Sequence, residues 1–373
     1  MVDLQGQYLN IQSQIDTKLN EVVASTSFIN GQEVKHFQKE LESYLNVKHV
    51  IPCGNGTDAL QIAMMGLGLQ SGDEVITVDF TFAATVEVIA LLGLKPVLID
   101  VYPDTFTMNI EALKQAITPQ TKAIVPVHLF GQCANMEAII QLAEQHHLFV
   151  IEDTAQAIGA DYIFSDGSKK KAGTIGTVGT TSFFPSKNLG AYGDGGALFT
   201  NDDALAEKLR SIVNHGMSKR YYYDRIGVNS RLDSLQAAVL RIKLPLLDTY
   251  AKARQKAASY YDKALSRCKK IKTPARSLFS THVFHQYTLI LEDVDRDALH
   301  LYLQEQGIPN AIYYPVPLHL QKAYQHFTFN SDELQVTKKL CQSVLSLPMH
   351  TELDEEQLEY ISSHIISFIK NNH

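Results

Sequence analysis

The spacing of hydrophobic residues between positions 50 and 200 alternates between two patterns. Short runs rich in β-branched and apolar residues recur, as in buried strands. These runs are 74–78, 95–100, 122–129, 148–153, 177–184 and 196–200. Segments with apolar residues at helical spacing separate several of them, at 56–69, 85–93, 109–117 and 134–147. Strands alternating with helices predict a mostly parallel sheet with both faces covered.

The pattern changes after about residue 248. Residues 249–265 read as a long polar helix, and 284–291, 297–307 and 354–370 indicate a smaller α+β unit. We therefore expect a large domain over residues 16–248. A small C-terminal domain is expected over residues 249–373, packed with residues 1–15.

Composition narrows the class of protein. The 373 residues are 45% hydrophobic and 20% charged, as in ordinary soluble domains. The net charge of -7 argues against general affinity for nucleic acid or anionic membranes. We find no signal peptide, no run near the ~20 apolar residues of a membrane span and no zinc-ligand spacing. The four cysteines are far apart, which favours reduced thiols and a cytoplasmic location.

Ligands of parallel sheets bind beyond the carboxyl ends of the strands, so residues there are candidates. Gly56, Thr57 and Asp58 open a predicted helix, whose free backbone N–H groups suit a phosphate. The alternative is an ordinary helix cap. Phe82 follows another strand, where it could stack on a flat ring or belong to the core.

A third strand ends in two carboxylates, Glu152 and Asp153, with Gln156 three residues beyond Asp153. A carboxylate there could pair with a cationic nitrogen of a ligand, with Gln156 reaching the same site. The alternative is a helix N-cap.

The stretch "SFFPSKNLGAYGDGG" places one lysine, Lys187, among apolar residues and glycines, with Ser182 near a strand end. Apolar surroundings lower the pKa of a lysine, and the neutral amine can form a Schiff base with a carbonyl. The alternative is a turn that happens to carry a lysine.

Two later segments are weaker candidates. Residues 218–238 interleave basic residues with tyrosines and offer Asn229 and Arg231, which suits a small phosphate or nucleotide, or a subunit interface. Residues 311–320 contain Tyr314 and His319 and could form a pocket wall. The alternative is that the polar residues of these segments are simply solvated at the protein surface.

These candidates together describe one ligand. The helix start would bind the ligand's phosphate, and the aromatic side chain would stack on the ligand's ring. The carboxylate would face the ring nitrogen, and the lysine would bind the aldehyde. That ligand is pyridoxal phosphate. Its supporting residues on an alternating α/β sheet fit the aspartate-aminotransferase fold (fold type I).

Several phrases of the sequence carry a more specific resemblance. They are "GNGTDAL", "GDEVITVDFTFAAT", "PVHLFGQC", "VIEDTAQAIGA", "TSFFPSKNLGAYGDGGALFTND", "GVNSRLDSLQAA" and "YYPVPLHLQ". Over essentially its whole length the chain resembles the DegT/StrS family of nucleotide-sugar aminotransferases. It looks most like the members that aminate C3 of a UDP-linked 2-acetamido-3-keto uronic acid. Thr154 stands where the family commonly has alanine, a conservative departure.

The resemblance implies roles for these residues. Lys187 would be the Schiff-base lysine and proton shuttle, and Asp153 would pair with the pyridinium nitrogen. Phe82 would stack on the ring, with Gln156 near its hydroxyl. The implied phosphate contacts are Gly56, Thr57, Asp58 and Ser182, with Asn229 supplied by the other subunit of a homodimer. The implied substrate contacts are Arg231, Tyr314 and His319.

The implied reaction is a ping-pong transamination from an amino acid, expected to be glutamate, to a keto group of a nucleotide-linked sugar. The amino sugar would serve the synthesis of a surface polysaccharide such as lipopolysaccharide. A dTDP-linked keto-deoxy sugar is the alternative substrate. A dehydratase of this fold would typically carry histidine at the lysine position, and a non-catalytic regulatory protein would not need Lys187 and Asp153. A Rossmann dehydrogenase lacks support, because no GxGxxG follows the first strand.

Overall fold

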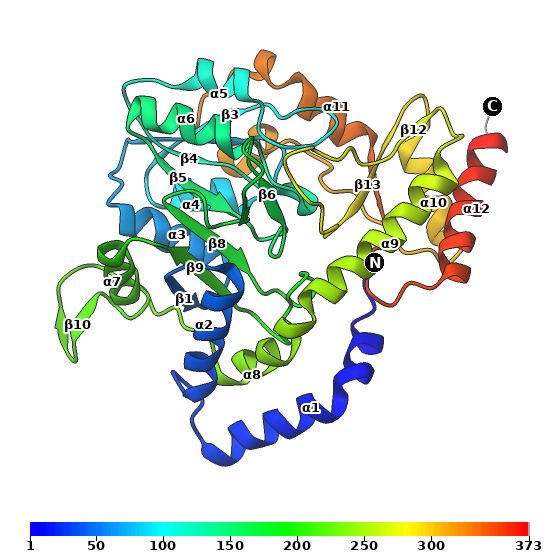
Figure 1. Cartoon of the computed structure of the whole chain (residues 1–373). Coiled ribbons are helices and arrows are strands. Elements are labelled where there is room, and N and C mark those ends of the chain that lie inside the picture. The colour runs from blue at the N-terminus through cyan, green and yellow to red at the C-terminus, as the bar shows by residue number, and fades with distance from the viewer. Residues whose placement is uncertain (372–373) are drawn as a thin grey trace.

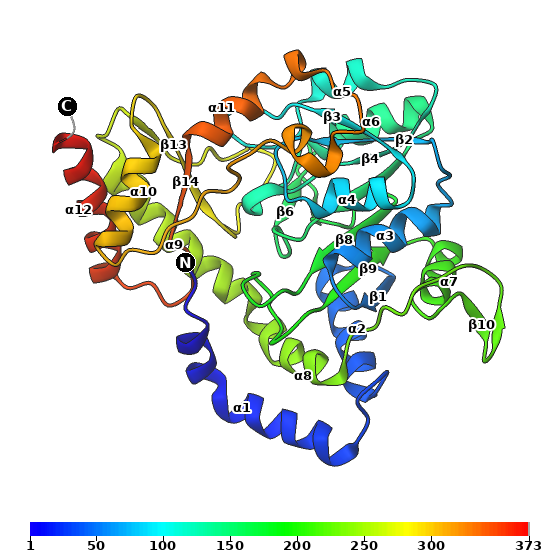
Figure 2. The same ribbon diagram turned by 180° about the vertical axis from the view of Figure 1, so that it is seen from behind.

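The computed structural model describes residues 1–371. Its centre is a seven-stranded sheet with the order β1-β9-β8-β5-β4-β2-β3 (Figures 1 and 2). The strands are β1 (His49–Cys53), β2 (Glu74–Val78), β3 (Lys95–Ile99), β4 (Thr121–Val125), β5 (Phe149–Asp153), β8 (Val178–Ser182) and β9 (Gly196–Thr200). Only β9 runs antiparallel to its neighbours, so the predicted mostly parallel mixed sheet is confirmed. The carboxyl ends of the other six strands therefore meet at one edge.

Alternate residues of each central strand enter different hydrophobic clusters. Ile76 and Val150 pack on one face of the sheet, whereas Val75 and Ile151 pack on the other. Because both faces are covered, the strands are apolar at consecutive positions, which is the pattern visible in the sequence.

Helices cover both faces of this sheet. The first face carries α5 (Ile110–Ala116), α6 (Met136–His146), α2 (Gln32–Leu45) and α8 (Ser234–Lys243), and the second carries α3 (Gly56–Leu67), α4 (Ala84–Leu91) and α7 (Asp203–Ile212). α1 (Leu4–Ser25) lies outside this layer and packs Ile11 and Ile15 against Val239 of α8.

A second core lies beyond the central sheet. The antiparallel sheet β12 (Ile271–Lys272), β13 (Tyr287–Leu291) and β14 (Val344–Leu347) packs with α9 (Leu247–Leu265), α10 (Arg296–Glu305) and α12 (Glu355–Asn371). In Figure 1, α9 runs from the neighbourhood of α8 to this second core. The division into two domains at residue 248 stays a prediction.

Part of the C-terminal half returns to the central sheet. α11 (Gln335–Ser343) places Leu340 and Cys341 in the cluster of the first face. The buried Asp100, which follows β3, accepts hydrogen bonds from the backbone N–H groups of Val336 and Thr337. Because α11 packs on the central sheet, the preceding residues 311–333 cross the edge of the sheet at which the parallel strands end.

Short elements complete the described chain. They are the hairpins β6 (Asp161–Ile163) with β7 (Lys169–Lys171) and β10 (Met217–Lys219) with β11 (Tyr222–Tyr223), and the 3-10 turns η1 (Leu129–Gly131), η2 (Leu244–Leu246), η3 (Leu318–Leu320), η4 (Lys322–Tyr324) and η5 (Ser331–Glu333). The β10–β11 hairpin projects away from the body in both views (Figures 1 and 2). Within residues 1–371, no helix combines the length and apolar character that crossing a bilayer requires.

Candidate functional site

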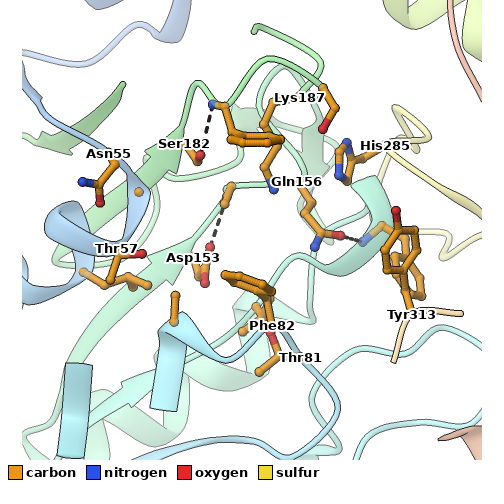
Figure 3. Close-up of a pocket in the computed structure, with 18 of the residues that line it drawn as sticks. Asn55, Thr57, Thr81, Phe82, Asp153, Gln156, Ser182, Lys187, His285 and Tyr313 are labelled. Carbon is orange, nitrogen blue, oxygen red and sulfur yellow. Dashed lines mark hydrogen bonds between the residues drawn. The ribbon is translucent and has the colours of Figure 1, made fainter. Parts of the chain in front are cut away.

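A cavity of about 750 Å³ opens at the carboxyl edge of the central sheet. Figure 3 shows residues from several strand ends converging on it, with the side chains of Lys187 and Asp153 directed inward. The lining residues among the predicted candidates are Gly56, Thr57, Asp58, Phe82, Asp153, Gln156, Ser182, Lys187 and Tyr314. The fold thus brings together segments that are up to 258 residues apart (from Gly56 to Tyr314).

The N-terminus of α3 forms one wall of the cavity. The side chain of Asn55 caps the helix by accepting a hydrogen bond from the N–H of Asp58, at 2.8 Å. Within the described chain, no group accepts a hydrogen bond from the backbone N–H of Gly56 or Thr57. These two donors and the helix dipole form a site for an anion.

Close packing around the helix start requires glycine at position 56. A Cβ atom there would lie 2.7 Å from Cβ of Ser182 at the end of β8. Any larger residue would push the helix start and Ser182 apart. The glycine therefore keeps the free N–H groups and the Ser182 hydroxyl on one side of the cavity.

Ser230 positions the side chain of Asp58. Its Oδ2 atom accepts a hydrogen bond from Ser230 Oγ at 2.6 Å, and Ser230 Oγ accepts one from the N–H of Gly54 at 2.9 Å. The segment next to Asn229 therefore fixes the helix start of its own chain.

The two carboxylates that end β5 face in opposite directions. Asp153 lines the cavity, where its Oδ2 accepts a hydrogen bond from Thr85 Oγ1 at 2.9 Å and its Oδ1 accepts one from the N–H of Ala155 at 3.1 Å. Neither partner is charged. The carboxylate can therefore offer its negative charge to a ligand.

Glu152 is fully buried on the other face of the strand. It is bound by His128 Nε2 at 2.9 Å and by three backbone N–H groups, those of Gly173, Ile175 and Gly176. Burial alone would raise the pKa of Glu152, but these hydrogen bonds and the charge of His128 lower it below its usual value. Glu152 is therefore held by the protein itself, and Asp153 is the one of the two carboxylates that lines the cavity.

Lys187 lies in a tight turn, where its own N–H donates to the carbonyl of Phe184 at 2.8 Å. Burial lowers the pKa of Lys187 to about 8, and the nearby charge of Asp153 partly opposes this shift. No group within residues 1–371 accepts a hydrogen bond from Nζ. The lysine therefore supplies a partly neutral, unpaired amine inside the cavity, as an attack on a carbonyl carbon requires.

Gln156 and Tyr314 form the wall opposite α3. Gln156 Oε1 accepts from the N–H of Phe130 at 2.8 Å, and its Nε2 donates to the hydroxyl of Tyr314 at 3.1 Å. Both side chains are thus fixed before a ligand binds.

Phe82 is 58% exposed although it lines the cavity. Its ring centroid lies 6.5 Å from that of Tyr314, too tilted for stacking between the two. One face of Phe82 is therefore available to a flat ligand ring, and the alternative of a core phenylalanine does not apply.

Three predicted residues lie outside the cavity of this chain. Asn229 is exposed next to the β10–β11 hairpin, and Arg231 precedes α8 without reaching the lining. His319 does not line the cavity either, and its expected contact with the substrate stays a prediction. His319 is buried, its Nδ1 lies 2.6 Å from Asp79 Oδ2, and its Nε2 lies 3.2 Å from Ser331 Oγ. With both nitrogens occupied, His319 anchors the returning segment to the end of β2.

Some lining residues were not predicted from the sequence. Asn55 could have been recognised as the helix cap before Gly56. His285, Gln286 and Tyr313 come from the C-terminal half, and no local motif indicates that they approach Lys187. Burial and the positive charges of Lys187 and Arg254 hold the pKa of His285 well below its usual value, so its imidazole is neutral.

The cavity offers a suitable partner for each functional group of pyridoxal phosphate. An anion site lies at α3, an amine without a hydrogen-bond acceptor at Lys187, a carboxylate with only uncharged hydrogen-bond donors at Asp153 and a free aromatic face at Phe82. The residues that would hold the cofactor therefore all come from one cavity of one chain, apart from Asn229.

Comparison with known proteins gives the same result. The model of the DegT/DnrJ/EryC1/StrS aminotransferase family matches residues 9–366. The UDP-2-acetamido-2-deoxy-3-oxo-D-glucuronate aminotransferase of Pseudomonas aeruginosa is 44% identical over 96% of this chain and 97% of its own length. A protein of Geobacillus stearothermophilus named pleiotropic regulatory protein is 46% identical over 100% of this chain and 98% of its own length.

Solved structures show the same fold. A DegT DnrJ EryC1 StrS aminotransferase from Brucella abortus superposes with a TM-score of 0.93 at 44% identity, covering 98% of both chains. The structure of ntda from Bacillus subtilis with bound cofactor PMP superposes with a TM-score of 0.87 at 31% identity, covering 97% of this chain and 82% of the other.

Proposed function

Because this chain belongs to the DegT/DnrJ/EryC1/StrS aminotransferase family, we propose that it aminates C3 of a UDP-linked 2-acetamido-3-keto hexuronic acid, with L-glutamate as the amino donor. The chain is a pyridoxal-phosphate-dependent aminotransferase. The observation that carries the proposal is a cavity lined together by Lys187, Asp153 and the free N-terminus of α3. The Pseudomonas relative supports this choice of sugar.

Pyridoxal phosphate, when bound, supplies an electron sink that stabilises negative charge at the carbon losing a proton. Lys187 would hold its aldehyde carbon and, once released, move a proton between the substrate carbon and the cofactor. Asp153 would keep the ring nitrogen protonated. Gly56, Thr57, Asp58 and Ser182 would orient the phosphate, and Phe82 would fix the plane of the ring.

The charges of the cavity support a homodimer. Within residues 1–371, its lining contains the carboxylates of Asp58, Glu87, Asp153 and Asp194, but only one lysine or arginine, the partly neutral Lys187. Glutamate, a uronic acid and a nucleotide diphosphate are all anionic, so further cations must come from elsewhere. The exposed β10–β11 region carries Lys219, Arg220 and Arg225, and a second copy could present it together with Asn229 and Arg231.

A subunit-mixing experiment tests this arrangement. Asn229→Asp should lower the activity by placing a negative charge beside the cofactor phosphate. Lys187→Ala should abolish the activity. If Asn229 acts across the interface, a heterodimer of the two variants contains one intact site and regains about half of the wild-type activity per dimer. If mixing restores no activity above that of the Asn229→Asp homodimer, the shared site is wrong.

The sugar is tested with a panel of UDP- and dTDP-linked keto sugars and glutamate. We expect the UDP-linked 3-keto uronic acid to give a kcat/KM at least about tenfold above the others, which corresponds to ~1.4 kcal/mol of transition-state discrimination. Preference for a dTDP-linked 3- or 4-keto-6-deoxy sugar would replace the proposed substrate but keep the reaction class. Dehydration without amine transfer would favour a dehydratase.

The Geobacillus relative raises a non-catalytic role as a second candidate, because its name describes a regulator. A protein that binds pyridoxal phosphate but converts no keto sugar in the panel would favour that role. The proposed biological setting is the synthesis of surface polysaccharide in the cytoplasm. All four cysteines are unpaired, in keeping with that location.

A further inference from the structure

The turn that carries Lys187 closes on itself. Gly190 packs so tightly on Pro185 that a Cβ atom at position 190 would lie 2.2 Å from the carbonyl oxygen of Pro185. The N–H of Ala191 donates to the carbonyl of Phe183 at 2.8 Å. Residues 184–190 therefore form one compact loop, and a group that holds Gly190 also holds the backbone on both sides of Lys187.

A buried lysine from another element holds that glycine. Lys243, the last residue of α8, is 1% exposed, and its Nζ donates a hydrogen bond to the carbonyl of Gly190 at 2.9 Å. The same Nζ lies 4.5 Å from the ring centroid of Tyr192. Burial lowers the pKa of Lys243 to about 8. The amine can donate to Gly190 in its charged and its neutral form, so this contact does not depend on protonation.

The first turn of α8 makes a second contact with the loop. Gln236 Oε1 accepts a hydrogen bond from the N–H of Tyr192 at 2.8 Å. On the opposite side, Asn188 Nδ2 donates to the carbonyl of Val283 at 2.9 Å. The loop is thus held between α8 and the segment before β13, with Lys187 facing the cavity.

Burying a lysine amine with one carbonyl partner and one ring face is costly, and an apolar residue would fill the same space without that cost. The feature that an apolar residue cannot reproduce is the hydrogen bond to Gly190. Without it the carbonyl of Gly190 would be buried and unpaired, and the loop would relax to find another donor.

We propose that Lys243 is a positioning residue for the transamination: its buried amine binds the Gly190 carbonyl and thereby fixes the loop that aims Lys187 into the cavity. This inference rests on the proposed role of Lys187 as the reacting amine. It assigns Lys243 no contact with cofactor or substrate.

The test compares Lys243→Met with the wild-type protein in two measurements. Lys243→Met keeps the apolar stem and removes the donor. Amide hydrogen exchange of residues 184–193, measured with the cofactor removed, should accelerate by about tenfold or more, whereas exchange in β5 and α3 stays unchanged. In the loaded enzyme, kcat should fall by about 10- to 100-fold while KM for the keto sugar stays within about twofold.

Two further variants make the result specific. Lys243→Arg keeps a donor on a long side chain and should restore part of kcat and part of the slow exchange. Lys252→Met removes an exposed lysine from the neighbouring α9 and should change neither measurement. If Lys243→Met does not fold, Gln236→Met removes the second contact of α8 with the loop and should accelerate exchange at residues 190–193.

Unchanged exchange at residues 184–193 in the variant that folds would overturn the proposal, even if its melting temperature falls. Faster exchange with an unaltered kcat would overturn it too, because the loop would then move without displacing Lys187. The exchange measurement needs no substrate. A failure of the proposed transamination therefore remains distinguishable from a failure of this inference.

Discussion

Lys187→Ala should abolish amine transfer, lowering kcat by about a thousandfold or more. The substitution removes the amine that lies unpaired in the cavity, with its pKa lowered by burial to about 8. Within residues 1–371, no other lysine lines the cavity, so this chain offers no second amine there for the attachment or the proton transfer. The measurement is steady-state turnover of glutamate with the keto sugar, together with a single half-reaction with glutamate alone.

The variant should nevertheless bind the cofactor non-covalently, because the anion site at α3, Asp153 and Phe82 are untouched. Lys252→Ala provides the matched control, since Lys252 is exposed on α9 and should tolerate the change. Near-normal turnover of Lys187→Ala would show that another residue performs both roles.

Asp153→Asn should lower kcat by about 100- to 10,000-fold while leaving the fold intact. Asparagine can keep the hydrogen bonds of the carboxylate with Thr85 and Ala155 in part, but it carries no charge to hold a ring nitrogen protonated. The charge of Asp153 raises the pKa of Lys187. Its loss should therefore also lower the pKa of the Lys187 amine further below about 8, which a pH titration of cofactor attachment measures.

Glu152→Gln is the matched control, because Glu152 is the neighbouring residue on the same strand but faces the opposite side. It disturbs a buried carboxylate with four hydrogen-bond donors around it. We expect a lower melting temperature with little change in the absorbance of the bound cofactor. The reverse result, with Glu152→Gln altering the absorbance and Asp153→Asn only the stability, would reassign the ring-facing carboxylate.

The sequence was sufficient for the parts of the fold with a strong local signal. Strands β2 and β9 have the predicted bounds, because fully buried strands are apolar at consecutive positions. β1 was missed because it contains Pro52, and a proline within a run argues against a central strand. α1 and α2 were missed because polar residues predominate and their few buried positions find partners only in the tertiary structure, such as Val239 for Ile11 and Ile15.

In the candidate site, too, local sequence patterns predicted some residues, whereas other contacts are visible only in the structure. The carboxylates at 152 and 153 were candidates because strand ends of a parallel sheet meet at one edge, and Lys187 was a candidate because it stands among apolar residues and glycines. Which of Glu152 and Asp153 faces the cavity depends on the pairing of β5 with its neighbours, and only the structure shows it. The buried contacts of His319 with Asp79 and of Lys243 with Gly190 join residues 240 and 53 positions apart, and no local pattern predicts them.

The central claim is that Lys187 holds pyridoxal phosphate in this chain. Borohydride reduction of the yellow, loaded protein, followed by peptide mapping, tests it most directly. The account predicts that the reduced cofactor is found on the peptide containing Lys187, and that Lys187→Ala yields no labelled peptide. A colourless protein that takes up no cofactor, or label on a different lysine such as Lys243, would contradict it.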